Sequence, residues 1–246
     1  MITAIIQARM RSTRLPNKVL LPLGGKTILE NVVERARQAK LIDQIVLATS
    51  TEPADDIIAN LCAQKGIDCF RGSENDVLDR FYQAALFHKA ENICRLTADC
   101  PLIDPAIIDK AAQEFLSGNY DYVSTSHPVA TYPDGFDTWI FSFAALARSW
   151  QEAKLPSERE HVTSYIWNHP EKFKISSVKN EVDLSAYRLT IDEPADYELL
   201  KLVVAGVKNL TLANIMKFLE THAQVCQINA DIIRDAGYGK SLLEDK

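Results

Sequence analysis

The segment ITAIIQARMRSTRLPNK, residues 2–18, joins a largely apolar run of five residues, ITAII, to a polar loop that is rich in basic side chains. The run at 2–6 has the length and continuous hydrophobicity of a strand buried on both faces. Apolar residues then recur at helical spacing over 27–39, from Ile28 to Ala36. The N-terminal segment therefore predicts a strand, a functional loop and a helix, in that order.

The same alternation continues toward the C-terminus. We expect strands at 45–48, 68–70, 92–96 and 120–123, separated by helices at 54–63, 76–87 and 105–116. Strands that alternate with helices at this spacing form a mainly parallel sheet with helices on both faces, through right-handed crossovers. The predicted fold class is thus α/β and Rossmann-like, and ligands are expected at the carboxyl ends of the strands.

After residue 130 the rhythm changes. Strands are expected at 138–143, 173–178 and 187–191, with helices at 144–152 and 156–169 and another that begins at Pro194. The sequence contains no internal repeat, low-complexity stretch or Pro/Gly-rich linker. We therefore expect a single domain over 1–246 with an elaborated second half.

Composition narrows the function classes. The net charge of −6 argues against a protein that neutralises a nucleic-acid backbone. Five cysteines form no C-x-x-C pair, which indicates reduced thiols in a cytoplasm. No signal peptide and no apolar stretch long enough to cross a bilayer are recognised. We expect a soluble, cytoplasmic protein, with disorder only near the polar residues 240–246.

The first loop, 7–18, concentrates positive charge inside an acidic protein. It contains Arg9, Arg11, Arg14 and Lys18 and no acidic residue. Guanidinium groups match phosphate oxygens, so this composition suits a triphosphate; the alternative is a solvated charged loop. Leu20 stands where a Walker loop ending in GKT would need glycine, and no G-x-G-x-x-G follows the first strand.

Two aspartates follow predicted strands directly. Asp99 lies in RLTADCPLID, residues 95–104, and Asp192 lies in RLTIDEP, residues 188–194. Mg²⁺ is typically held by one or two carboxylates together with phosphate oxygens and water. Either aspartate could instead be a helix cap. Together they predict a magnesium site at the strand ends.

Five motifs make the sequence recognisable. They are QARMRSTRLPNKVL at 7–20, FRGSENDVLDR at 70–80, RLTADCPLID at 95–104, REHVT at 159–163 and RLTIDEPAD at 188–196. In combination they closely resemble the spore-coat polysaccharide biosynthesis protein F family, over roughly residues 2–200. That family looks like a branch of the cytidylyltransferases that activate sialic, legionaminic, pseudaminic and ketodeoxyoctonic acids, and it implies a nucleotide-diphospho-sugar transferase (GT-A-like) sheet.

The resemblance implies a set of site residues. Asp99 and Asp192 would bind Mg²⁺ or Mn²⁺. The nucleotide-binding candidates are Gln7, Ala8, Arg9, Ser12, Thr13, Arg14, Lys18, Arg71, Ser73, Asp76 and Thr97, with Arg95 as a further residue facing the base. The acceptor-binding candidates are Tyr132, Asp137, Arg159, Glu160 and His161. Ser73 could equally cap a helix, and residues 159–161 could equally form surface ion pairs.

The chain departs from the family pattern at three positions. Arg11 and Asn17 stand where glycine is common in the first loop, and Trp139 stands where a glutamate is frequent. Arg11 and Asn17 leave the backbone of the loop less free to wrap around phosphate than glycine would. Trp139 affects which acceptor the site takes.

The implied reaction is attack of a sugar hydroxyl on the α-phosphate of CTP, with release of pyrophosphate. Arg9, Arg14 and Lys18 would hold the β- and γ-phosphates. The expected partners are CTP, a small acidic sugar and a second copy of the chain that docks through 131–178. Three alternatives stay open: a cytidylyltransferase for a polyol or phosphonate, a GT-A-type glycosyltransferase, although no Asp-x-Asp is present, and a catalytically silent nucleotide-binding protein.

Overall fold

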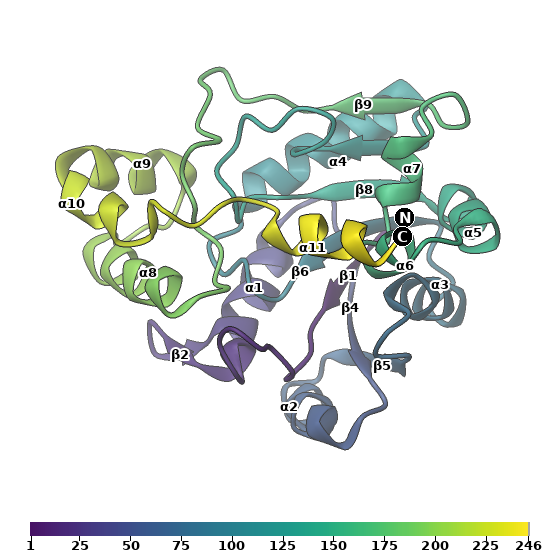
Figure 1. Cartoon of the computed structure of the whole chain (residues 1–246), viewed down its shortest axis with the longest axis horizontal. Helices are drawn as coiled ribbons and strands as arrows, with labels where there is room; N and C mark the ends of the chain where they lie inside the picture. Colours follow the sequence, from purple (N-terminus) through teal and green to yellow (C-terminus); the bar gives the residue numbers. More distant parts are fainter. Residues whose placement is uncertain (246) are drawn as a thin grey trace.

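A computed structural model of the chain describes residues 1–245, and a seven-stranded sheet forms its centre (Figure 1). The spatial order of the strands is β5 (Asp68–Gly72), β4 (Gln44–Ser50), β1 (Ile2–Gln7), β6 (Asn92–Thr97), β8 (Trp139–Ser142), β7 (Tyr122–Ser124) and β9 (Ile175–Ser177). All neighbouring pairs are parallel except the two that involve β8. The predicted mainly parallel α/β fold is confirmed.

Helices cover both faces of this sheet. The helices α1 (Ile28–Gln38), α4 (Pro105–Gly118), α8 (Pro194–Gly206) and α9 (Leu212–Thr221) share one hydrophobic core, and α3 (Val77–Phe87), α5 (Phe143–Glu152) and α7 (Ser164–Asn168) share the other. Alternate residues of β1 enter different cores, since Ala4 and Ile6 belong to the first and Ile5 belongs to the second. This period of two is the strand geometry that the apolar run predicts.

Local sequence fixes where the helices begin. Thr27 and Glu30 form a reciprocal capping box at the start of α1, in which each side chain accepts a backbone N–H of the other residue. Asp104 caps α4, and Pro105 occupies its first position, where a missing N–H costs nothing. A short hairpin of β2 (Pro22–Leu23) and β3 (Lys26–Thr27) and the helix α2 (Asp56–Lys65) complete the first half.

Two predicted elements of the second half are wrong in detail. The helix expected over 156–169 is two helices, α6 (Pro156–Glu160) and α7, because Val162 between them has a left-handed φ of 56°. The strand expected at 187–191 is a single bridge between Asp134 and Arg188. Its neighbouring amides bond instead to loop carbonyls, Leu189 to Asp134 and Ile191 to Asp99.

The expected disorder at the C-terminus is also wrong for the residues that the structure describes. The short helix α10 (Ala223–Cys226) is followed by α11 (Ala236–Glu244), which packs beside α6 and passes in front of the central strands in Figure 1. Ser157 bonds through both its amide and its hydroxyl to the carboxylate of Asp245. Tertiary contacts thus order a segment whose polar composition favours disorder.

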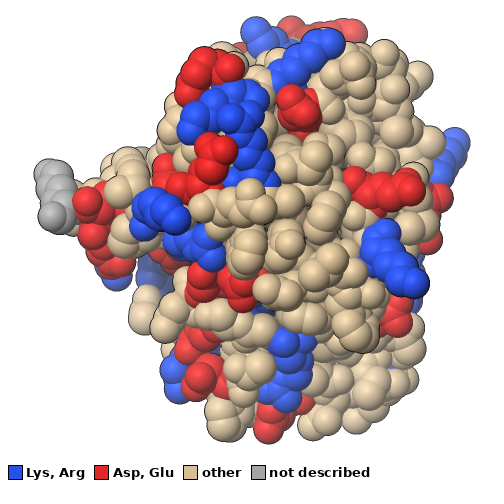
Figure 2. All heavy atoms as spheres, turned by 90° about the vertical axis from the view of Figure 1, so that its right-hand side faces the viewer, with Lys and Arg blue, Asp and Glu red and all other residues tan. Residues whose placement is uncertain are grey.

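Basic and acidic side chains lie next to one another on the face that Figure 2 shows, without a continuous basic field. Within the described chain, no helix has both the length and the hydrophobicity that a membrane span needs.

Candidate active site

A cavity of about 350 Å³ opens at the carboxyl ends of the central strands. Gln7, the last residue of β1, and Thr97, the last residue of β6, both line it. The remaining walls come from the loop after β1, from residues 134–139, 160–161 and 188–192, and from the C-terminal segment 233–238. The cavity therefore lies where ligands bind in open α/β sheets.

The basic loop forms one wall of the cavity. Its lining residues are Gln7, Ala8, Arg9, Arg11, Ser12, Thr13, Arg14 and Lys18, which include every loop residue that the sequence predicts for nucleotide binding. The buried carboxylate of Asp55 holds the loop in place by accepting a hydrogen bond of 2.7 Å from the amide of Met10. Asn17 adopts φ 60°, a left-handed conformation that asparagine tolerates better than most residues. Asn17 can therefore serve where glycine is common.

Lys18, Asp99 and Asp192 meet at one point of the cavity. The ammonium of Lys18 lies 2.7 Å from Asp99 Oδ2 and 2.8 Å from Asp192 Oδ1. Burial alone would lower the pKa of Lys18, but the two carboxylates raise it above its usual value. Burial likewise opposes ionisation of Asp192, yet Lys18 and Arg14 lower its pKa to about 2. Both carboxylates are thus held in reach of one cation, although they are far apart in the sequence.

These two carboxylates fit a divalent cation. Their oxygens reach the same cation-occupied position, and Mg²⁺ needs only one or two carboxylates when substrate phosphates supply further ligands. No group of three or more His, Cys, Asp or Glu side chains in residues 1–245 is placed to hold a metal without such help. The donor set therefore suits a metal that arrives with phosphate rather than a closed structural site.

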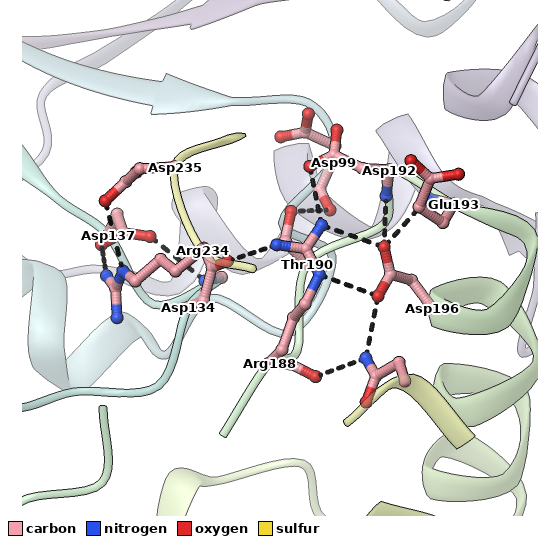
Figure 3. Close-up of polar contacts among 12 residues, drawn as sticks. Asp99, Asp134, Asp137, Arg188, Thr190, Asp192, Glu193, Asp196, Arg234 and Asp235 are labelled. Carbon is pink, nitrogen blue, oxygen red and sulfur yellow. Dashed lines mark hydrogen bonds and ion pairs between the residues drawn. The ribbon is translucent and has the colours of Figure 1, made fainter. Parts of the chain in front are cut away.

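A buried arginine fixes the orientation of Asp192. Arg188 donates to Asp134 at 2.6 Å, to Asp192 at 2.8 Å and to Asp196 at 2.9 Å, and Figure 3 shows its guanidinium between the three carboxylates. Burial would lower the pKa of Arg188, but Asp196 and Asp134 raise it, so the group stays charged. Asn229 adds a bond to Asp196. The sequence motif RLTIDEPAD thus supplies Arg188, Asp192 and Asp196 to one network of ion pairs.

Several candidates in and after β5 lie outside the cavity. Arg71 donates to the backbone carbonyls of Ser50 and Glu52 and pairs with Asp56. Ser73 accepts the amide of Asp76, and Asp76 in turn caps α3. The structure therefore gives these side chains local tasks, whereas their neighbours Val77 and Arg80 line the cavity.

The acceptor candidates divide in the same way. Asp137, Glu160 and His161 line the cavity. Tyr132 is buried but does not line the cavity, and its hydroxyl accepts a hydrogen bond from the ammonium of Lys110. Arg159 also lies outside it, since its guanidinium is taken by Asp76 at 2.5 Å and by the carbonyl of Trp150.

The C-terminal segment is the part of the site that the sequence does not reveal. Arg234 pairs with Asp137 at 2.6 Å, and Ser241 of α11 donates to Glu160 and contacts His161. Ile233, Asp235, Ala236, Gly237 and Tyr238 also line the cavity. No motif or periodicity marks this segment, because its role depends only on the tertiary fold, which brings it back to the cavity.

Burial and the nearby charge of Arg95 lower the pKa of His161 to about 4, so its ring is neutral at pH 7.

The structure combines a mainly parallel sheet, a cationic loop at its strand ends and two carboxylates that share one cation. These are the features of the nucleotidyltransferase class. The sequence matches the cytidylyltransferase family over residues 3–233. This chain belongs to that family, and it is a CTP-dependent nucleotidyltransferase. The glycosyltransferase and silent-binder alternatives are thereby set aside.

Individual proteins are also similar to this chain. The chain is 41% identical to an uncharacterized protein of Methanocaldococcus jannaschii, over 94% of this chain and 95% of that protein. It is 39% identical to the spore coat polysaccharide biosynthesis protein SpsF of Bacillus subtilis, over 81% and 85%. A solved cytidylyltransferase structure from Leptospira borgpetersenii superposes with a TM-score of 0.87 at 36% identity, over 92% and 96%. A 3-deoxy-manno-octulosonate cytidylyltransferase of Geobacter sulfurreducens is 38% identical over 45% of this chain and 43% of its own.

Proposed function

We propose that this chain transfers CMP from CTP to a hydroxyl of an acidic sugar, as a step in making a surface polysaccharide or glycan. The observation that carries the proposal is the meeting of Lys18 with Asp99 and Asp192 beside a loop of three further arginines. That arrangement offers a metal position and a triphosphate cradle in the same cavity. The names of the B. subtilis and G. sulfurreducens relatives support the polysaccharide pathway and the sugar acid.

The proposed reaction forms one P–O bond and breaks another. The acceptor hydroxyl releases its proton to solvent as its oxygen attacks the α-phosphorus of CTP, the bond from that phosphorus to the oxygen that bridges to the β-phosphate breaks, and pyrophosphate leaves. Arg9, Arg14 and Lys18 hold the β- and γ-phosphates and neutralise the charge of the leaving group. Asp99 and Asp192 hold Mg²⁺ or Mn²⁺, which polarises the α-phosphate when bound. Lys18 neutralises both carboxylates in this structure, and it would be free to bind the phosphates if a metal occupied its position.

Further parts of the proposal concern the whole molecule. The segments around Asp137, Glu160 and His161 bind the acceptor, because they line the cavity beside the metal position. The chain forms one domain over 1–246, acts in the cytoplasm and dimerises through 131–178. Gel filtration with light scattering tests the dimer directly, and a monomer at micromolar concentration would contradict it.

A pyrophosphate-release assay tests the function. CTP, UTP, ATP and GTP are each supplied with sialic, legionaminic, pseudaminic or ketodeoxyoctonic acid, with Mg²⁺ or with a chelator. We expect release with CTP and at least one of the acids, and none with the chelator. Release with a polyol phosphate or a phosphonate, and with none of the acids, would refute the acidic acceptor and leave the CTP-dependent class intact.

A further inference from the structure

The floor of the cavity contains a buried arginine without an ionic partner. Arg95 points from the middle of β6, is 6% exposed and lines the cavity. No carboxylate of residues 1–245 lies within the 4.0 Å ion-pair distance of its guanidinium, although Asp99 and Asp137 are close enough to influence its pKa. Burial lowers that pKa to about 10, so Arg95 is still a cation at pH 7.

Most of the donors of Arg95 are unused. Its Nε–H donates to Gln7 Oε1 at 3.0 Å, and the plane of the guanidinium is supported by the ring of Trp139, whose centroid is 4.4 Å from Cζ. The two terminal nitrogens carry four further N–H groups. Within the described chain they have no hydrogen-bond partner, and they are not among the unpaired atoms that are sealed from solvent. They are therefore available to a molecule in the cavity.

The other arginines in or near the acceptor half are already engaged. Arg159, one of the acceptor-binding candidates from the sequence, is held by Asp76. Arg234 is held by Asp137.

Arg80 is also buried in the cavity lining without an ion pair, but one of its terminal nitrogens donates to the backbone carbonyls of Ser73 and Glu74. Arg95 is thus the buried arginine of the lining that has no acceptor in the described chain for either terminal nitrogen. Burying such a charge is costly unless a bound group pairs with it.

We propose that Arg95 binds the carboxylate of the acceptor sugar, which makes it the residue that selects an acid. This inference rests on the proposed function and names the group that the acceptor must carry. A carboxylate accepts two parallel N–H bonds from a guanidinium and cancels its charge. Besides its amino donor, a cytosine ring offers only neutral acceptors, and the triphosphate already has the cationic side chains of the loop after β1.

Two variants separate recognition from folding. Arg95→Met keeps much of the length of the side chain and removes its charge. Gln7→Glu keeps Arg95 and places a competing carboxylate at the position that now accepts from its Nε. Arg35→Met is the matched control, because Arg35 is a partly buried arginine that bonds to the carbonyls of Ile103 and Leu210 and does not line the cavity.

The assay compares each sugar acid that the wild type uses with its carboxamide. Steady-state pyrophosphate release gives kcat and KM for the acceptor, and calorimetry without acceptor gives the Kd of CTP. We expect Arg95→Met to raise the acceptor KM on the order of 100-fold, the loss of one charge-assisted hydrogen-bonded pair. The preference for acid over carboxamide should disappear in Arg95→Met and fall in Gln7→Glu, and it should persist in Arg35→Met.

Two results would overturn the assignment. If Arg95→Met weakens CTP binding while the preference for the acid is retained, Arg95 serves the nucleotide, and the proposed function survives. If the wild type uses no sugar acid but does use a neutral acceptor, the proposed function and this inference fail together. Should Arg95→Met fail to fold, an unchanged preference in Gln7→Glu would refute the assignment by itself.

Discussion

Replacing Asp99 by asparagine tests the metal position with almost no change in shape. The carboxylate lies 2.7 Å from the ammonium that now occupies this position. At that distance a pair of unit charges is worth about 1.5 kcal/mol in water and about 6 kcal/mol at an effective dielectric constant of about 20. The Asp99 side chain is 25% exposed, so we take about 3 kcal/mol, which corresponds to roughly 150-fold in affinity.

The assay is pyrophosphate release from CTP during a Mg²⁺ titration. Asp99→Asn should need a Mg²⁺ concentration about two orders of magnitude higher for half-maximal turnover. Circular dichroism should show an unchanged fold. Asp183→Asn is the matched control, because Asp183 lies in an exposed loop outside the cavity. If Asp99→Asn kept the wild-type metal requirement and turnover, the assignment of Asp99 as a ligand would be refuted.

Three further substitutions test the scaffold by chemical denaturation. Arg188→Met should cost about 3–5 kcal/mol of unfolding free energy, because it leaves the fully buried Asp196 without its cation; a loss below about 1 kcal/mol would contradict this role. The Lys65 contact and the cap lower the pKa of Glu30 from 4.5 to about 2. Because this pKa is lowered in the folded state, the ionised Glu30 carboxylate stabilises the fold above about pH 4.5, and this contribution is lost as the pH falls toward 2. Glu30→Gln should therefore lower the unfolding free energy by about 1 kcal/mol at pH 7 and leave it unchanged near pH 2. Equal costs at both pH values would exclude this contribution. Gly135→Ala should destabilise more than Gly66→Ala, since both have positive φ but only the first would drive its Cβ to 2.5 Å from backbone; equal losses would argue against the close approach.

The sequence predicts the first half of the fold well because its elements depend on local pattern. Apolar runs such as 2–6 and helix starts such as Thr27 and Asp104 carry their own signals. The second half depends on contacts between distant segments. A left-handed residue such as Val162 divides a helical pattern that looks continuous, and no rule of periodicity anticipates it.

The site shows the same division. The loop residues and both aspartates can be found because each follows a predicted strand, and strand ends converge in a parallel sheet. Asp76 and Arg159 are conspicuous in the sequence but neutralise each other. Arg95 stands out only after its surroundings are known, since an unpaired charge is a property of the fold and not of a motif.

The helix α11 has a consequence for partial unfolding. Arg234 and Ser241 bond to Asp137 and Glu160, which lie 97 and 81 positions earlier in the chain, so this wall of the cavity exists only while α11 packs beside α6. Local opening that releases α11 should therefore dismantle the acceptor pocket while the central sheet stays folded.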